Sequence, residues 1–259
     1  MTSVVGRIAA AMGLIAASSG SAAQRDPLAP LPTGPVQPAT SPARASAIPF
    51  TPLGQPPIGL RDEINRLGRA FDGKAGISII SLKDGWAVDY NAASLFPQQS
   101  VSKLWVAITA LDAVDRGAVS LTDRVTVGRS DLTLFHQPIA TRIRGGEHTT
   151  TVGTLLFTAI TASDNTANDS LMRAIGGPDA VRRMIQRKQI GAVRFFDGER
   201  SLQSKIAGLT WSQSYSIGDA FYKARNALPF SVRKAAFDRY VQDPYDGASV
   251  AAVVNALAR

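Results

Sequence analysis

The sequence predicts an α/β domain of the α+β type, in which a helix and a β-hairpin are followed by a mainly helical region. Between residues 74 and 92 apolar and polar side chains alternate on both sides of a Lys-Asp-Gly turn, as they do in a hairpin. From residue 100 onwards apolar residues recur at helical spacing. The chain has 259 residues, of which 45% are hydrophobic and 19% charged, and this composition suits one sizeable globular domain.

The first 23 residues have the features of a secretory signal peptide. Arg7 supplies a positive charge, the apolar run IAAAMGLIAA follows, and Ser21 and Ala23 fit a small-x-small cleavage site. The alternative is a membrane anchor, but the run is too short to cross about 30 Å of hydrocarbon. We therefore expect an exported protein, periplasmic or secreted, without stable membrane insertion.

Residues 24–57 form a proline-rich segment that contains ten of the fifteen prolines in the chain. Such a segment cannot form a helix or a central strand, because proline lacks the backbone N–H that these structures need. An extended linker is expected, and a ligand for a proline-binding domain is the less favoured alternative. The folded domain is then expected over residues 58–259.

The folded part begins with an amphipathic helix over residues 60–71, which has apolar side chains on one stripe. The hairpin comes next, and helical patterns then follow over residues 101–117, 151–162, 166–177, 177–189, 216–228 and 230–242. Two strands alone make a marginal sheet. The apolar pattern GASVAAVVNALAR also continues to Arg259 without a capping signal. The domain is therefore expected to be incomplete at its C-terminal end.

Composition excludes several classes of function. The net charge is +8, but the Lys and Arg residues are scattered, so nucleic acid is not an expected partner. There is no cysteine, which excludes disulfides, thiolate nucleophiles and cysteine metal sites. The two histidines, His136 and His148, lack metal-ligand spacing. No metal or organic cofactor is expected, and the chemistry must come from Ser, Lys, Asp, Glu, Tyr or backbone groups.

The stretch FPQQSVSKLW, residues 96–105, places Ser100 and Lys103 three positions apart where a helical pattern begins. On a helix this spacing brings the two side chains within reach of each other. An alcohol is a weak nucleophile that needs a base, and a lysine can serve once it is desolvated or assisted by another group. The N–H at a helix start can also donate to an oxyanion. The alternative is that Ser100 only caps the helix.

Two further motifs could supply partners for this serine. Ser163, Asp164 and Asn165 lie in the loop between two apolar helical patterns, where capping is the ordinary role of such residues. The stretch FDGERSLQ, residues 196–203, carries Glu199, for which an exposed loop carboxylate is the alternative. Neither motif identifies a function alone, and their order and spacing are the stronger signal.

Together the three motifs resemble those of the class A serine β-lactamases and, more broadly, of the penicillin-recognising serine enzymes. In that family the Ser-x-x-Lys pair follows Phe-Pro, as it does here, and Ser-Asp-Asn comes at a distance like that between Ser100 and Ser163. The likeness covers residues 60–211 well and residues 247–259 weakly. It implies a β-lactamase/transpeptidase-like fold, with a helical lobe beside an antiparallel sheet lobe. Only the first two strands of that sheet are expected in this chain.

The resemblance implies an acyl-enzyme mechanism. Ser100 would attack the carbonyl of a β-lactam ring, with its own N–H as half of the oxyanion hole. Lys103, Glu199 through a water, or both would accept the serine proton. Ser163 would relay a proton to the leaving nitrogen.

The same resemblance implies roles for the other site residues. Asn165 would bind the side-chain amide of the substrate, and Asp164 would be structural. Glu199 and Gln203 would activate the water that cleaves the acyl-enzyme, although Gln203 stands where the family usually has Asn. Phe135 is expected as an aromatic wall near the site or as a plain core or rim residue.

The sequence departs from the family pattern in three places. No Lys-Ser/Thr-Gly motif follows residue 203, although the family carries it on a strand opposite Ser-Asp-Asn that supplies the other oxyanion donor. Gln98 stands where the family usually has an apolar residue, and residues 212–246 are longer than the family core requires. The 259-residue chain is therefore expected to be inactive by itself.

The prediction is an exported, monomeric β-lactamase that acts on a small β-lactam and confers antibiotic resistance. Two alternatives stay open. A D-alanyl-D-alanine peptidase or transpeptidase would share Ser100 and Lys103 but would not need Glu199. A non-catalytic domain or fragment is suggested by the missing third motif and the basic charge.

Overall fold

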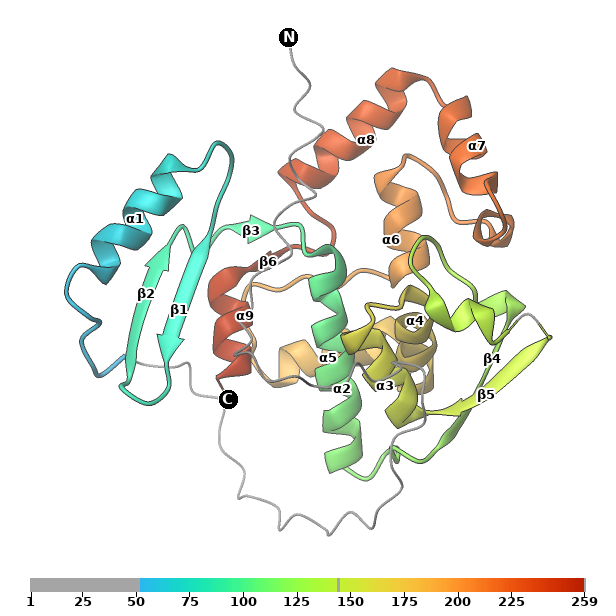
Figure 1. Cartoon of the computed structure of the whole chain (residues 1–259), viewed down its shortest axis with the longest axis horizontal. Coiled ribbons are helices and arrows are strands. Elements are labelled where there is room, and N and C mark those ends of the chain that lie inside the picture. The colour runs from blue at the N-terminus through green and yellow to red at the C-terminus, as the bar shows by residue number, and fades with distance from the viewer. Residues whose placement is uncertain (1–51, 144, 259) are drawn as a thin grey trace, which may run out of the picture.

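The computed structural model of the protein describes residues 52–143 and 145–258. The predicted signal peptide and the linker up to residue 51 lie outside the described residues. Figure 1 shows a small layer, built on a hairpin between helices, beside a larger helical region. Among the described residues no helix is both long enough and apolar enough to cross a membrane.

The small layer confirms the predicted helix and hairpin. It consists of α1 (Leu60–Ala70), β1 (Ile77–Ser81), β2 (Trp86–Tyr90) and, from the end of the chain, α9 (Val250–Leu257). The two strands pair antiparallel in a register that runs from Ile77 opposite Tyr90 to Ser81 opposite Trp86. The helix α1 contacts β2 and α9 contacts β1, so the hairpin lies between two helices (Figure 1). This packing supplies the helix layer that an isolated hairpin needs.

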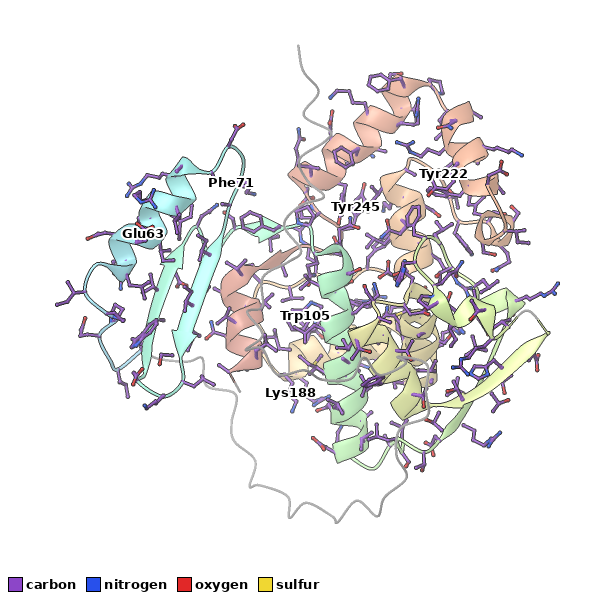
Figure 2. All side chains as sticks on the ribbon, in the orientation of Figure 1. Glu63, Phe71, Trp105, Lys188, Tyr222 and Tyr245 are labelled. Atoms are coloured by element: carbon purple, nitrogen blue, oxygen red, sulfur yellow. The ribbon has the colours of Figure 1, made fainter. Side chains whose placement is uncertain are left out.

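The larger region is built around α2, which is buried along most of its length. Its helices are α2 (Lys103–Asp115), α3 (Val152–Thr161), α4 (Asn165–Ala174) and α5 (Gly177–Arg187). The helix α2 contacts each of the other three. Trp105 belongs to α2, and its side chain is fully buried in the interior (Figure 2). The apolar run in the sequence therefore corresponds to a helix that is enclosed on several sides.

Two strand pairs differ from the expectation that only the first hairpin is present. They are β4 (Arg124–Gly128) with β5 (Glu147–Thr151), and β3 (Leu95–Phe96) with β6 (Ala248–Ser249), both antiparallel. The second pair has two residues in each strand and joins segments far apart in the chain. Such a pair has no detectable alternation, so a local pattern could not predict it. It ties the segment before Ser100 to the start of α9.

A group of helices lies at the end of the molecule where α2 begins (Figure 1). They are α6 (Glu199–Ile206), α7 (Ala220–Ala227) and α8 (Phe230–Gln242). Short 3-10 turns complete the fold at Gln99–Ser102, Arg129–Asp131, Pro138–Thr141 and Gln213–Ser216. The helices α7 and α8 confirm the predicted patterns. The motif at residues 196–203 was expected in a loop, but from Glu199 onwards it forms α6, which packs against α4 and α8.

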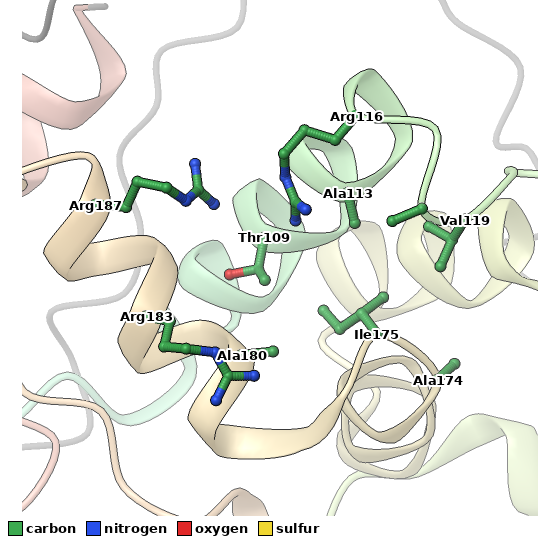
Figure 3. A pocket seen from close by; sticks show the side chains of 10 residues that line it. Thr109, Ala113, Arg116, Val119, Ala174, Ile175, Ala180, Arg183 and Arg187 are labelled. Atoms are coloured by element: carbon green, nitrogen blue, oxygen red, sulfur yellow. The ribbon is translucent and has the colours of Figure 1, made fainter.

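A cavity of about 380 Å³ lies at the other end of α2 and is lined partly by Arg116, Arg183 and Arg187 (Figure 3). Beside it the buried Asp112 carboxylate accepts hydrogen bonds from Arg116 Nε at 2.9 Å and from a terminal nitrogen of Arg187 at 2.6 Å. Lys188 Nζ lies 3.2 Å from the same carboxylate. Burial alone would raise the pKa of Asp112, but the hydrogen bonds from these cations lower it well below its ordinary value.

Asp112→Asn is expected to lower the free energy of unfolding at pH 7 by about 1–2 kcal/mol, because three half-exposed cations lose their shared counter-charge. The folded pKa of Asp112 lies below the unfolded value of about 3.9, so its contribution is complete above about pH 4 and is lost as the pH falls further. Urea unfolding of both proteins at pH 7, 4 and 3 measures the difference, with Asp115→Asn as a control. A difference that does not shrink below pH 4 would contradict this origin.

Candidate active site

Ser100 lies in the 3-10 turn that leads into α2, and its hydroxyl oxygen accepts two hydrogen bonds. Lys103 Nζ donates to it at 2.9 Å and Ser163 Oγ donates at 3.1 Å. The N-cap of α2 is Ser102, whose own hydroxyl donates to the carbonyl of Gln99 at 2.7 Å. The capping interpretation of Ser100 is therefore wrong. The structure brings together the Ser-x-x-Lys pair and the serine of the second motif.

Lys103 also forms a buried ion pair with Glu199. The distance from Lys103 Nζ to Glu199 Oε1 is 2.6 Å, and the two side chains are only 2% and 3% exposed. An exposed loop carboxylate is therefore the wrong interpretation of Glu199. Two charges so far from water are stable only as a closely paired and hydrogen-bonded unit. The same ammonium group thus bridges the Ser100 hydroxyl and the Glu199 carboxylate.

The position of Glu199 is fixed by Asp169 and Gly198. The buried Asp169 carboxylate accepts hydrogen bonds from Glu199 N at 2.9 Å and from Arg200 N at 3.4 Å. Gly198 has a left-handed φ of 87°, and a Cβ there would lie 2.6 Å from the Met172 methyl group. Burial raises the pKa of Asp169 to about 6, and the nearby negative charge of Glu199 contributes to the increase.

Gln203 lies one turn after Glu199 on α6. Its amide nitrogen is 3.2 Å from Glu199 Oε2 and 3.3 Å from Gln99 Oε1. The predicted pair of Glu199 and Gln203 is therefore in direct contact. The amide holds the carboxylate oxygen that does not face Lys103, so both oxygens of Glu199 have partners.

The Ser-Asp-Asn motif begins α4. Asp164 is the N-cap and accepts hydrogen bonds from Ala167 N at 2.8 Å and Ile139 N at 2.6 Å. Burial raises the pKa of Asp164, although these backbone bonds oppose the effect. The Asn165 amide donates to the carbonyl of Leu134 at 2.9 Å. Asp164 thus has a structural position, and Asn165 joins α4 to the neighbouring loop.

Phe135 lies in that loop beside the residue that Asn165 contacts. Its side chain is 48% exposed and its backbone has a left-handed φ of 61°. The ring meets the ring of Phe221, from α7, edge to face at 5.3 Å. Of the two expectations for Phe135, a rim position fits this exposure.

Sequence reasoning did not find Asp169 and did not explain Gln98. The amide of Gln98 accepts a hydrogen bond from Trp105 Nε1 and donates to the carbonyl groups of Arg194, at 3.2 Å, and Asp246. A buried polar side chain at this position is therefore satisfied. A signal for Asp169 was present in the sequence, because the run NTANDS places polar residues all round a helix that turns out to be buried.

Nowhere in residues 52–143 and 145–258 do three His, Asp or Glu side chains gather in a way that could hold a metal ion. The site is a set of hydrogen-bonded residues gathered at the starts of α2 and α6 and along α4. Its members are Ser100 and Lys103 at the start of α2, Ser163 before α4, Asp169 on α4, and Glu199 and Gln203 on α6. Such an arrangement can move a proton between a hydroxyl, an amine and a carboxylate.

Known proteins are similar to this chain in sequence and in fold. A model of the beta-lactamase enzyme family matches residues 59–209. A beta-lactamase of Rhodobacter capsulatus is 29% identical over 135 residues, which cover 52% of this chain and 45% of that protein. The extended-spectrum beta-lactamase PER-1 of Pseudomonas aeruginosa is 32% identical over 138 residues, which cover 53% of this chain and 44% of that protein. The chain spans about half the length of the curated relatives it matches.

Solved structures of beta-lactamases also resemble the fold of this chain. A beta-lactamase from Chitinophaga pinensis matches with a TM-score of 0.56 at 22% identity, covering 76% of this chain and 61% of that one. An ancestral class A beta-lactamase matches with a TM-score of 0.52 at 26% identity, covering 76% of this chain and 62% of that one. The predicted fold class, mixed helices with small antiparallel sheets of the class A β-lactamase type, is therefore confirmed.

Asp169→Asn keeps an acceptor for Glu199 N but removes a buried charge. The pKa of Asp169 is about 6 in the folded protein and about 3.9 in an unfolded chain. The contribution of Asp169 to the free energy of unfolding is therefore complete below about pH 4 and is lost as the pH rises through 6. This loss lowers the free energy of unfolding by about 2–3 kcal/mol. Urea unfolding between pH 4 and pH 8 should show this decrease in the wild type and a flatter profile in the variant. Identical profiles would show that Asp169 is not the titrating group.

Proposed function

The chain belongs to the beta-lactamase enzyme family, and we propose that it opens β-lactam rings through an acyl-enzyme on Ser100. One observation carries the proposal: Lys103 Nζ contacts Ser100 Oγ at 2.9 Å and Glu199 Oε1 at 2.6 Å. A nucleophile, a base and a second proton acceptor are thereby connected in one buried chain. The activity, the substrate and the roles of the residues are parts of this proposal.

The acylation step follows from these contacts. Lys103 passes a proton to Glu199 and becomes a neutral amine, which then accepts the proton of Ser100. The serine oxygen bonds to the β-lactam carbonyl carbon and the ring C–N bond breaks. The leaving nitrogen takes a proton from Ser163, whose hydroxyl is 3.1 Å from Ser100 Oγ, and Lys103 returns a proton to Ser163. The Ser100 N–H donates to the oxyanion while it exists.

The deacylation step uses the other side of Glu199. Glu199 first returns its proton to Lys103, 2.6 Å away, and the carboxylate then accepts a proton from a water molecule whose oxygen attacks the acyl carbon. The Gln203 amide, 3.2 Å from Glu199 Oε2, orients the carboxylate and can hold the same water. The acyl bond to Ser100 breaks, Lys103 gives a proton to the serine oxygen and takes one from Glu199, and the ring-opened acid leaves.

Asn165 and Phe135 are proposed to contact the substrate. One N–H of the Asn165 amide is used by Leu134, and the carbonyl oxygen of this amide can accept a hydrogen bond from a substrate amide. The exposed ring of Phe135 offers an apolar contact at the rim. No metal or organic cofactor takes part in the proposed reaction.

Export and resistance complete the proposal. Residues 1–23 would direct the chain out of the cytoplasm, and residues 24–57 would separate the domain from the cleavage site. A monomeric enzyme in the periplasm or medium would meet β-lactams before they reach their targets. Residues 204–259 contain no Lys-Ser/Thr-Gly motif, so acylation is tested before turnover.

A penicillin should add its own mass once to the wild-type chain, on the peptide that contains Ser100. Ser100→Ala should abolish the addition, because no other hydroxyl contacts both Lys103 and Ser163 among the described residues. Mass spectrometry of the intact and digested protein measures both results. A wild-type chain that is never acylated would favour the non-catalytic alternative.

Glu199→Gln should slow acylation, because Lys103 loses its proton acceptor, and should trap the acyl-enzyme that does form. Loss of a general base is expected to slow release by about 10²–10⁴-fold. Decay of the acylated mass, and turnover of a chromogenic cephalosporin, measure the effect, with Glu147→Gln on β5 as a control for the same change elsewhere. Stable acylation of the wild type would instead support a penicillin-binding peptidase, for which Glu199 is not needed.

A further inference from the structure

We propose that Tyr240 and Asp246 are positioning residues for Ser100, because they hold Gln99 in the backbone conformation that presents the Ser100 hydroxyl to Lys103. Both belong to the segment that follows α6. The inference rests on the proposed function only in taking Ser100 as the nucleophile. It assigns a role to a part of the chain that lies beyond residue 209, where the match to the family ends.

Gln99 has an unfavourable backbone conformation directly before Ser100. Its φ is 50°, in the left-handed region that side chains with a Cβ rarely adopt. Such a residue costs about 1–2 kcal/mol and persists only where its surroundings compensate. Relaxation of Gln99 would rotate the peptide that carries the Ser100 N–H and would move the hydroxyl away from Lys103.

All four polar groups of Gln99 have partners. Its N–H donates to Asp246 Oδ2 at 3.0 Å, and its carbonyl accepts from Ser102 Oγ at 2.7 Å. Its side-chain nitrogen donates to the Tyr240 hydroxyl at 2.8 Å, and its side-chain oxygen accepts from Gln203 Nε2 at 3.3 Å. One partner, Ser102, lies in the same 3-10 turn as Gln99, and the others come from α6, α8 and the turn after α8, so the residue is fixed from several directions.

The two proposed positioning residues are themselves immobilised by burial. Tyr240 is 2% exposed and Asp246 is 1% exposed. The backbone carbonyl of Asp246 also accepts a hydrogen bond from Gln98, and Ala248 pairs with Phe96 in the β3–β6 ladder. Figure 1 shows the C-terminal end of α8 beside the connection from β3 into α2. The turn after α8 is thus attached to the chain along the whole approach to Ser100.

Tyr240 is also linked to the deacylation side of the site. Its hydroxyl contacts the Gln99 side chain, Gln99 contacts Gln203, and Gln203 contacts Glu199. Burial, together with the neighbouring Asp246, raises the pKa of the Tyr240 phenol far above its ordinary value. The phenol therefore stays neutral and acts by hydrogen bonding, not by titration.

Tyr240→Phe removes only this hydroxyl and is the test. It should lower the rate constant for acylation of Ser100 by a penicillin about tenfold, because the free energy of one lost hydrogen bond corresponds to a change of this size. The apparent Kd for the penicillin should stay nearly unchanged. Tyr245→Phe is the matched control, because its ring packs on Tyr240 at 6.0 Å but its hydroxyl does not contact Gln99. Stopped-flow acylation and thermal unfolding are measured on the full chain for each protein.

Gln99→Gly separates positioning from a general loss of stability. Glycine adopts the left-handed conformation freely and has no side-chain amide, so Tyr240→Phe should have no further effect on acylation in this background. The proposal is overturned if Tyr240→Phe is acylated as fast as the wild type, or if Tyr245→Phe lowers the acylation rate constant as much as Tyr240→Phe does. It is also overturned if the effects of Gln99→Gly and Tyr240→Phe on this rate constant add in the double variant.

A reagent that needs only a nucleophile distinguishes this inference from the proposed function. An alkyl fluorophosphonate forms a bond from phosphorus to Ser100 Oγ with loss of fluoride, and the serine proton goes to Lys103. If the wild-type chain reacts with this reagent but not with a penicillin, the proposed function fails. The positioning inference then stands or falls on whether Tyr240→Phe slows the fluorophosphonate reaction about tenfold while Tyr245→Phe does not.

Discussion

The buried ion pair between Lys103 and Glu199 is the constraint on which the rest of the site depends. A charge removed from water is tolerated only where partners satisfy it. Lys103 obtains Ser100 as a second partner, and Glu199 obtains Gln203. These contacts require the start of α6 to close against the start of α2, and Asp169 fixes that closure through Glu199 N. The ion pair therefore determines which side chains surround the Ser100 hydroxyl.

The contact between the starts of α2 and α6 explains why strained backbone and buried polar groups occur around Ser100. Gly198 and Gln99 have left-handed φ angles on either side of the ion pair, one before Glu199 and one before Ser100. Left-handed residues at such positions redirect the chain over a short distance. The compensation comes from hydrogen bonds between distant segments, above all those that Gln98 and Gln99 donate to Asp246. The strained backbone at Gln99 is thus stabilised by hydrogen bonds to a segment far away in the chain.

Local patterns in the sequence were sufficient for most helices, whereas the grouping of Ser100 with Ser163 and Glu199 depended on the resemblance of three spaced motifs to a known family. The amphipathic spacing of α1 and the apolar run of α2 each depend on nearest neighbours, and a spacing of three residues places Lys103 beside Ser100. Contacts between distant segments were not accessible, because the two-residue pair β3–β6 leaves no periodic signal. For the same reason the roles of Tyr240 and Asp246 became visible only in the fold, where nearly 150 residues of chain separate Asp246 from Gln99.

The charge of Glu199 affects the pKa of two other buried carboxyl groups, those of Asp169 and Asp246. The negative charge of Glu199 contributes to the raised pKa of both Asp169 and Asp246, after the larger effect of burial. The neutral side chain of a Glu199→Gln variant would remove that contribution, and both neighbours would ionise more readily. Ionised carboxylates accept stronger hydrogen bonds from Glu199 N and Gln99 N. The charge of Glu199 is thereby coupled to the contacts that hold its own backbone N–H and that of the residue before Ser100.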